Sequence, residues 1–246
     1  MSLLRAVGAV ILGKTDTVEF AATGRRAATR NPLDLTRTRG GSSSGSAAAV
    51  ADRHVPLAVT TQTGGSTIRP ASFCRIWALK PTWGLISTGG CKRYAPTLGT
   101  LGWMARSAAD LRPLLDVFDA EGAPASDPPF ELEGARIAIC RTPMWLRAEP
   151  ATQAAMEHAQ DLLARAGAQL HPLDLPSPFE SLPALQMRVM RAEGQVSLLN
   201  EYRLHGDALE PSLRDQVLLT GARFSDRRVI AVAQTLGRLL AAAGPH

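Results

Sequence analysis

Apolar residues are grouped into short runs that polar, glycine-rich and proline-rich segments separate. A short apolar run between turn residues is typical of a buried strand. On this basis we predict strands at residues 6–13, 56–60, 135–140 and 169–173. A further apolar stretch, 76–80, is closed by Pro81. From Pro81 to residue 102 we expect irregular or short-stranded structure, because this segment is rich in Gly, Pro and Thr.

Helical periodicity marks several other segments. Ser107 and Asp110 form a capping-box pattern ahead of apolar residues spaced at i, i+3, i+4 and i+7, which are Leu111, Leu114, Leu115 and Phe118. A helix predicted at 150–166 ends before Gly167, and its apolar face comprises Ala155, Met156, Ala159, Leu162, Leu163 and Ala166. Further helices are predicted at 44–52, 183–204, 211–219 and 225–243.

The alternation of strands and helices indicates an α/β protein. We expect residues 1–246 to form a single domain, with a seam between substructures at the Gly-, Pro- and acid-rich connection 121–134. Residues 20–39 carry five arginines and are interpreted as a surface loop. These arginines are expected to be solvated, and a clamp for an anionic substrate is the alternative. The apolar run at 6–12 lacks a cleavage site, so we interpret it as a strand rather than a signal peptide.

The net charge of +5 is concentrated in the first part of the chain. Residues 1–110 contain 14 Lys and Arg against 5 Asp and Glu, but these basic residues form no run with interleaved aromatics. We therefore expect no nucleic-acid partner. Cys74, Cys91 and Cys140 are scattered, which indicates reduced thiols, a cytoplasmic location and no zinc site. No apolar segment has the length of a membrane span, and no motif indicates a cofactor or a metal.

Two clusters of glycine and hydroxyl residues hold the candidate chemistry. The first, 40–46, precedes an alanine-rich helix, and Ser42 or Ser44 is expected to cap its first turn. The second, 61–70, follows a predicted strand. Serine acts as a nucleophile when a base removes its proton, and consecutive glycines can supply backbone donors for an oxyanion. The alternative is a pair of plain turns. The first cluster lacks the lysine of a phosphate-binding loop.

Several motifs, in the same order and at similar spacing, resemble the amidase signature family. They are 8–15, Asn31-Pro32, the two clusters, Phe73-Cys74, Leu79-Lys80-Pro81-Thr82 and 102–107. The strong part of the resemblance runs from residue 3 to about residue 120. It implies an α/β/α sandwich with a mixed β-sheet, of which this chain holds an incomplete part. It also implies amide hydrolysis by a triad of serine, serine and lysine.

The resemblance implies a role for each polar residue of the clusters. Ser66 would be the nucleophile, and Ser42, preceded by a cis peptide bond, would relay the proton between Ser66 and a lysine. The oxyanion hole would comprise Thr63, Gly64, Gly65 and the Ser66 amide. Ser43 would be a supporting hydrogen-bonding residue. Arg69 would either bind a carboxylate or pair with a nearby acid, and Cys74 is interpreted as a small buried residue rather than a second nucleophile.

The lysine of the triad has no match in this sequence. In the family it lies upstream of the strand predicted at 6–13, and Lys14, Lys80 and Lys92 match other positions. The motifs also depart from the family at several positions. Gln62 stands where many relatives carry an acid, and Arg39 stands where proline is usual. Asp52-Arg53 stands where small residues and glycine are common, and Arg75 stands where glycine is usual. We therefore expect an internal piece of an amidase-type domain.

Two hypotheses follow from the resemblance. In the first, the protein hydrolyses the carbon–nitrogen bond of a small-molecule amide through an acyl-enzyme on Ser66. In the second, it is a catalytically inactive truncated paralogue, or one component of a split amidase or amidotransferase. A second polypeptide would then supply the missing parts of the domain, including the lysine.

Overall fold

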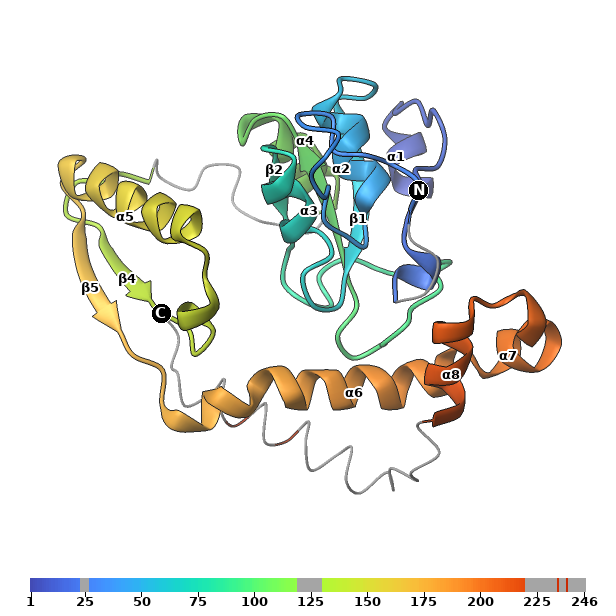
Figure 1. Cartoon of the computed structure of the whole chain (residues 1–246). Helices are drawn as coiled ribbons and strands as arrows, with labels where there is room; N and C mark the ends of the chain where they lie inside the picture. Colours follow the sequence, from blue (N-terminus) through green and yellow to red (C-terminus); the bar gives the residue numbers. More distant parts are fainter. Residues whose placement is uncertain (23–26, 119–129, 220–233, 235–237, 239–246) are drawn as a thin grey trace. The chain divides into compact units, whose positions relative to one another are not determined.

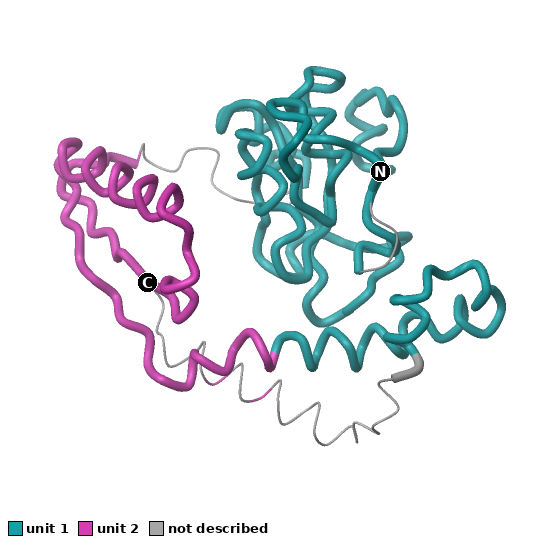
Figure 2. The backbone as a smooth tube through the Cα atoms, in the orientation of Figure 1, with its two compact units in different colours: residues 1–121, 186–233 teal, residues 122–185, 234–246 magenta. Residues whose placement is uncertain are grey.

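The computed structural model describes residues 1–22, 27–118, 130–219, 234 and 238. Contacts within the chain define two compact units, which Figure 2 colours separately. Unit 1 comprises residues 1–121 and 186–233, and unit 2 comprises residues 122–185 and 234–246. The first boundary between them falls within the connection 121–134. That the whole chain forms a single domain stays a prediction.

Unit 1 is built around a three-stranded antiparallel sheet in the order β1-β3-β2. Its strands are β1 (Leu57–Gln62), β2 (Trp77–Leu79) and β3 (Thr100–Ala105). Trp103 of β3 is paired with Val59 on one side and with Leu79 on the other. Every residue of β3 is buried, because this strand has a neighbour on each side and helices above and below.

Helices cover both faces of this sheet (Figure 1). They are α1 (Ser2–Ala6), α2 (Ser44–Ala51), α3 (Ile68–Phe73) and α4 (Arg112–Phe118). Successive residues of a strand point to opposite faces. Accordingly, Met104 packs with residues of α2 and α3, whereas Trp103 packs with Leu4 of α1 and Leu114 of α4. Unit 1 is thus an α/β/α arrangement, and together with the parallel strands of unit 2 it confirms the predicted α/β fold class.

The later part of unit 1 is helical. It contains most of α6 (Leu182–Ser197), then α7 (Leu199–His205) and α8 (Pro211–Leu219). The helix predicted at 183–204 is interrupted at Leu198, which leaves helical geometry (φ −101°, ψ 5°) and is fully buried in a cluster with Tyr94. The prediction at 211–219 is confirmed, and the one at 225–243 lies outside the described residues. No helix in the described part is long and apolar enough to cross a membrane.

Unit 2 contains a strand–helix–strand element, as predicted. The parallel strands β4 (Arg136–Cys140) and β5 (Gln169–Leu173) are joined through α5 (Pro150–Arg165) (Figure 1). Gly167 adopts φ +86°, and the N–H groups of Gly167 and Ala168 bond the last carbonyls of α5. Of the predicted apolar face, Met156 and Leu163 are half-buried and the other four residues are exposed.

The strand predicted at 6–13 is wrong. Residues 2–6 form α1, and no strand is described from residue 7 to residue 13. Ile11 packs against the Trp103 cluster, but Val10 and Leu12 are 82% and 72% exposed. A strand exists only where a neighbouring strand accepts its hydrogen bonds. The described residues provide no such neighbour along this segment.

The capping pattern at Ser107 is confirmed. The Ser107 hydroxyl accepts a hydrogen bond from the Asp110 N–H at 3.1 Å. The helix begins as a 3₁₀ turn, Ala109–Leu111, and continues as α4. Its predicted apolar residues all belong to the hydrophobic cluster that contains Trp103 or pack against that cluster. The segment between residues 80 and 100 is irregular, as expected, but the central strand β3 that follows was not predicted.

An ion pair joins the loop before Tyr94 to α7. Lys92 Nζ lies 2.6 Å from Glu201 Oε1. The hydrogen bond from Lys92 holds the pKa of Glu201 below its ordinary value of 4.5. A carboxyl whose pKa is depressed by folding stabilises the fold above its unfolded pKa, and this contribution disappears as the pH falls through the folded pKa.

We therefore expect Lys92→Met to lower the free energy of unfolding near neutral pH by the small amount typical of a partly exposed pair, about 0.2–1 kcal/mol. The difference from wild type should shrink as the pH is lowered from 6 to 3. Thermal melts followed by circular dichroism measure it, and Arg112→Met, which removes an exposed pair with Asp116, is the control. A difference that stays constant over this range would contradict the assignment.

Candidate active site

The first cluster forms a tight loop at the start of α2. Ser43 is the N-cap residue, but its side chain makes no capping hydrogen bond. The Ser44 hydroxyl lies within the first turn and donates backward to the Gly40 carbonyl at 3.0 Å. The prediction that Ser42 or Ser44 caps this helix is therefore wrong.

Hydrogen bonds to the main-chain carbonyl fix the position of Ser42, whereas its hydroxyl has no partner among the described residues. The peptide bond between Gly41 and Ser42 is cis. The Ser42 carbonyl accepts hydrogen bonds from the N–H groups of Val18, at 3.2 Å, and Ser44, at 2.9 Å. The residue is only 5% exposed, and its Oγ has no hydrogen-bond partner among the described residues. A buried hydroxyl without a partner is uncommon and marks a position where another group is expected to bind.

The second cluster links the end of β1 to the start of α3. Gln62 closes β1, and its side-chain oxygen accepts hydrogen bonds from the N–H groups of Thr67, at 2.9 Å, and Ile68, at 3.0 Å. The hydroxyls of Thr60 and Thr67 are 2.8 Å apart and buried. Both contacts fix the main chain directly after Ser66. An amide at position 62 makes these bonds as a carboxylate would, so Gln62 can take the place of the acid that the family resemblance implies.

The turn before α3 presents unused donors. Within the described part of the chain, the N–H groups of Gly64, Gly65 and Ser66 donate to no other group. Ser66 is 6% exposed, and Gly64 is exposed. Successive N–H groups of a tight turn can bind an anion. The turn can therefore stabilise negative charge beside Ser66.

The two clusters are adjacent in space. The Ser43 N–H donates to the Ser66 carbonyl at 3.3 Å, and the Ser43 hydroxyl donates to the Thr61 carbonyl at 3.4 Å. The structure thus brings Ser42, Ser43 and Ser66 together, as the resemblance implies, although they are separated by up to 24 positions in the sequence.

The side chain of Arg69, in the second cluster, also contacts the first cluster. Its Nε and Nη2 atoms both donate to the Gly41 carbonyl, at 3.0 and 2.8 Å. The described partner of Arg69 is therefore a main-chain carbonyl, and no pairing with an acid is seen among the described residues. The guanidinium fixes the residue that precedes Ser42.

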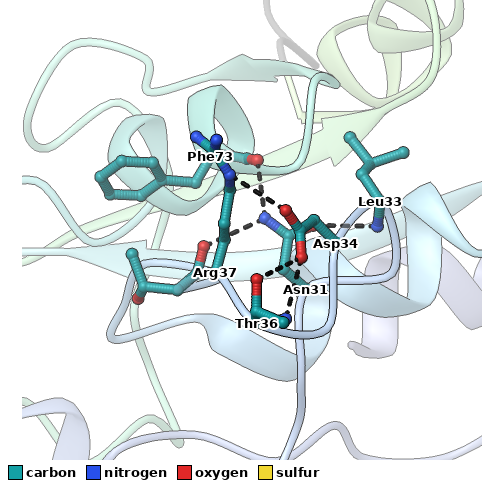
Figure 3. Close-up of polar contacts among 7 residues, drawn as sticks. Asn31, Leu33, Asp34, Thr36, Arg37 and Phe73 are labelled. Carbon is teal, nitrogen blue, oxygen red and sulfur yellow. Dashed lines mark hydrogen bonds and ion pairs between the residues drawn. The ribbon is translucent and has the colours of Figure 1, made fainter.

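A buried asparagine connects the segment before the first cluster to α3 (Figure 3). Asn31, 3% exposed, donates its side-chain amide to the carbonyls of Thr38 and Phe73, both at 3.0 Å, and accepts from the Leu33 N–H at 3.0 Å. Asp34 closes the turn by bonding Thr36 and Arg37. Asn31 thus ties the turn leading to the first cluster to the C-terminal end of the helix that follows Ser66.

Gln186 of α6 also reaches the second cluster. Its Nε2 donates to the Thr63 carbonyl at 2.9 Å. Sequence reasoning missed this residue, because it lies 123 positions from Thr63 in an amphipathic helix where a half-buried Gln is unremarkable.

Comparison with known proteins identifies the family of this chain. The family profile described as Amidase matches residues 1–231. The chain belongs to the amidase family. It resembles one component of the glutamyl-tRNA(Gln) amidotransferase of Symbiobacterium thermophilum, with 39% identity over 198 residues that cover 74% of this chain and 41% of that protein.

Solved amidase structures share the fold. A crystal structure of an amidase has a TM-score of 0.86 and 25% identity, covering 97% of this chain and 54% of the other. The native peptide amidase from Stenotrophomonas maltophilia has a TM-score of 0.75 and 27% identity, covering 97% and 58%. The chain thus spans about half the length of the amidase-family proteins that it matches.

None of the three lysines of this amidase-family chain bonds Ser42. Lys80 Nζ donates to the Pro81 carbonyl at 2.7 Å, and Lys92 pairs with Glu201. Lys14 lines an open hollow of about 420 Å³ with Asp16 and residues of α2, and Ser42 is not among its lining residues. The geometry agrees with the family resemblance, which assigns these lysines to other positions.

Two of the departures from the amidase motifs fall where the backbone is left-handed. Arg53 and Arg75 have φ of +63° and +52°. Glycine adopts such angles at little cost, whereas other residues are disfavoured there. Both side chains are exposed, so neither arginine is a buried charge. Arg39, in place of the usual proline, donates to the Ala27 carbonyl at 2.7 Å.

The thiols near the site are expected to differ strongly in reactivity. Cys74 is 1% exposed, and burial raises the pKa of its thiol, whereas Cys91 is exposed. Because the thiolate is the reactive form, a thiol reagent should modify Cys91 at once and Cys74 only after unfolding. Titration with Ellman's reagent, with Cys91→Ser as the control, measures this. Rapid reaction of Cys74 in the folded protein would contradict its interpretation as a buried, unreactive residue.

Proposed function

We propose that this amidase-family protein takes part in hydrolysing the carbon–nitrogen bond of a small-molecule amide, with Ser66 as nucleophile and Ser42 as proton relay. One observation carries the proposal. The unpartnered, buried hydroxyl of Ser42 lies in a loop that is hydrogen-bonded to Ser66 through Ser43, beside three unused N–H groups. Acyl transfer requires a nucleophilic hydroxyl, a group that passes on its proton, and donors that stabilise the oxyanion.

In the proposed reaction, Ser66 Oγ bonds to the amide carbon and loses its proton toward Ser42. The N–H groups of Gly64, Gly65 and Ser66 receive the negative charge on the carbonyl oxygen. The carbon–nitrogen bond then breaks, and the nitrogen leaves with the proton that came from Ser66. Water attacks the acyl-enzyme, releases the acid and restores the Ser66 hydroxyl.

The general base is proposed to be a lysine that lies outside residues 1–246, in the same polypeptide or in a second one. The family resemblance implies a lysine beside the bridging serine, and no described lysine bonds Ser42. One relative is named as a component of an amidotransferase, which indicates that related chains act in assemblies. The three free thiols support a cytoplasmic setting. A catalytically inactive protein of the same fold is the second candidate.

Fluorophosphonate labelling followed by peptide mapping tests the proposal. We expect the label on Ser66 and on no other serine of the two clusters. The labelling rate should rise with hydroxide concentration, because no described lysine bonds Ser42 to act as the base. Labelling confined to exposed serines elsewhere would contradict the proposal and favour the inactive protein. Faster labelling after addition of a polypeptide that carries the family lysine would identify the source of the base.

A further inference from the structure

Gln186 lies against the turn that presents the unused N–H groups. Besides donating to the Thr63 carbonyl, its side chain packs on Gly64. A Cβ atom added to Gly64 would lie 3.1 Å from Gln186 Nε2. Both residues belong to unit 1, and the bond to Thr63 places the Gln186 side chain directly after the end of β1.

The hydrogen bond to the Thr63 carbonyl determines where the next N–H points. A trans peptide is planar, so its carbonyl and its N–H point in opposite directions. Holding the Thr63 oxygen toward Gln186 therefore directs the Gly64 N–H away from Gln186. Glycine at positions 64 and 65 permits this peptide to rotate, so the turn itself does not fix the direction.

We propose that Gln186 is a positioning residue, which orients the Gly64 N–H toward the developing oxyanion. The inference rests on the proposed function, in which this N–H is an oxyanion donor. The role requires a side chain that donates. Glutamate has the same shape but only accepts when ionised, and it would repel the Thr63 carbonyl. Leucine fills similar space without any polar contact.

Labelling kinetics test the chemical consequence. A fluorophosphonate binds reversibly before it reacts, so the kinetics separate the binding constant from the rate of inactivation. Loss of one oxyanion donor lowers the rate of acyl transfer about 10²–10³-fold. Gln186→Leu and Gln186→Glu should lower the inactivation rate by about tenfold or more, because the donor is misdirected only part of the time. The binding constant should change little.

Gln160→Leu is the matched control. Gln160 Nε2 also donates to a main-chain carbonyl, that of Met156 at 3.1 Å, but within α5 of unit 2. The Gln160→Leu variant should react with the fluorophosphonate at the wild-type rate. Equal labelling of all three variants, or equal losses in Gln160→Leu and Gln186→Leu, would overturn the assignment. A change confined to the binding constant would also overturn it.

A second measurement does not depend on catalysis. The ¹⁵N order parameter of the Gly64 N–H should be near the rigid value of about 0.85 in wild type and below about 0.6 in Gln186→Leu. If wild type shows no labelling of Ser66, the proposed function fails but this comparison still tests Gln186. An unchanged order parameter would show that Gln186 does not hold the turn.

Discussion

Replacing Ser66 by alanine is expected to reduce fluorophosphonate labelling of the cluster peptides to background. The reagent forms a covalent bond to the nucleophilic oxygen, and the variant lacks that atom. The Ser66 hydroxyl makes no described hydrogen bond, so its removal should leave the folded structure intact. Labelling followed by gel fluorescence, with thermal melting of the same samples, measures both effects.

In the presence of a polypeptide that supplies the family lysine, Ser42→Ala should lower the rate of the same reaction by about tenfold or more without preventing it, because members of a catalytic set act as a unit. Ser46→Ala is the control. Ser46 is also a buried serine of the first cluster, but its hydroxyl is hydrogen-bonded to the Thr15 hydroxyl, at 2.8 Å, and to the Val59 carbonyl, at 3.3 Å. Persistent labelling of Ser66→Ala at the wild-type rate would exclude Ser66 as the nucleophile.

The positions of the two clusters were predictable because their signals are local. Glycines, hydroxyl residues and an alanine-rich run occur together within a few positions, and the structure confirms both α2 and the turn after β1 there. The same holds for the Ser107 cap and for Gly167, where one short segment contains the whole motif.

Other features depend on residues far apart in sequence. The strand predicted at 6–13 has the right composition, but strand formation requires a partner, and composition does not reveal whether one is present. Conversely, β3 was not predicted, because Thr100 and Gly102 interrupt its apolar residues and the segment before it is rich in Gly, Pro and Thr. The contacts of Gln186 and Arg69 with main-chain carbonyls leave no pattern in the sequence at all.

These two contacts act in a similar way. Arg69 holds the Gly41 carbonyl, directly before Ser42, and Gln186 holds the Thr63 carbonyl, directly before Gly64. In each case a side chain outside the loop fixes a peptide that glycine would leave free to rotate. Glycine gives the loops their tight geometry, and the side chains restrict them to one conformation.

Gly40→Ala is expected to cause a large loss of stability. Gly40 has φ +73°, and an added Cβ would lie 2.5 Å from the Phe73 ring and 2.8 Å from the Pro70 Cα. A left-handed conformation costs a residue with a side chain about 1–2 kcal/mol. Overpacking adds about 1–3 kcal/mol, because the Pro70 backbone cannot move without shifting α3.

Gly90→Ala separates these two costs. Gly90 has a similar φ of +76°, but nothing lies within 4 Å of an added Cβ. It should show only the conformational cost, whereas Gly40→Ala should lose about 2–5 kcal/mol in urea unfolding. Because Gly40 lies directly before Gly41 and Ser42, its replacement should also slow the labelling of Ser66. Equal stabilities of the two variants would mean that the contact of Gly40 with Pro70 and Phe73 is not tight, and that the first cluster is not held against α3.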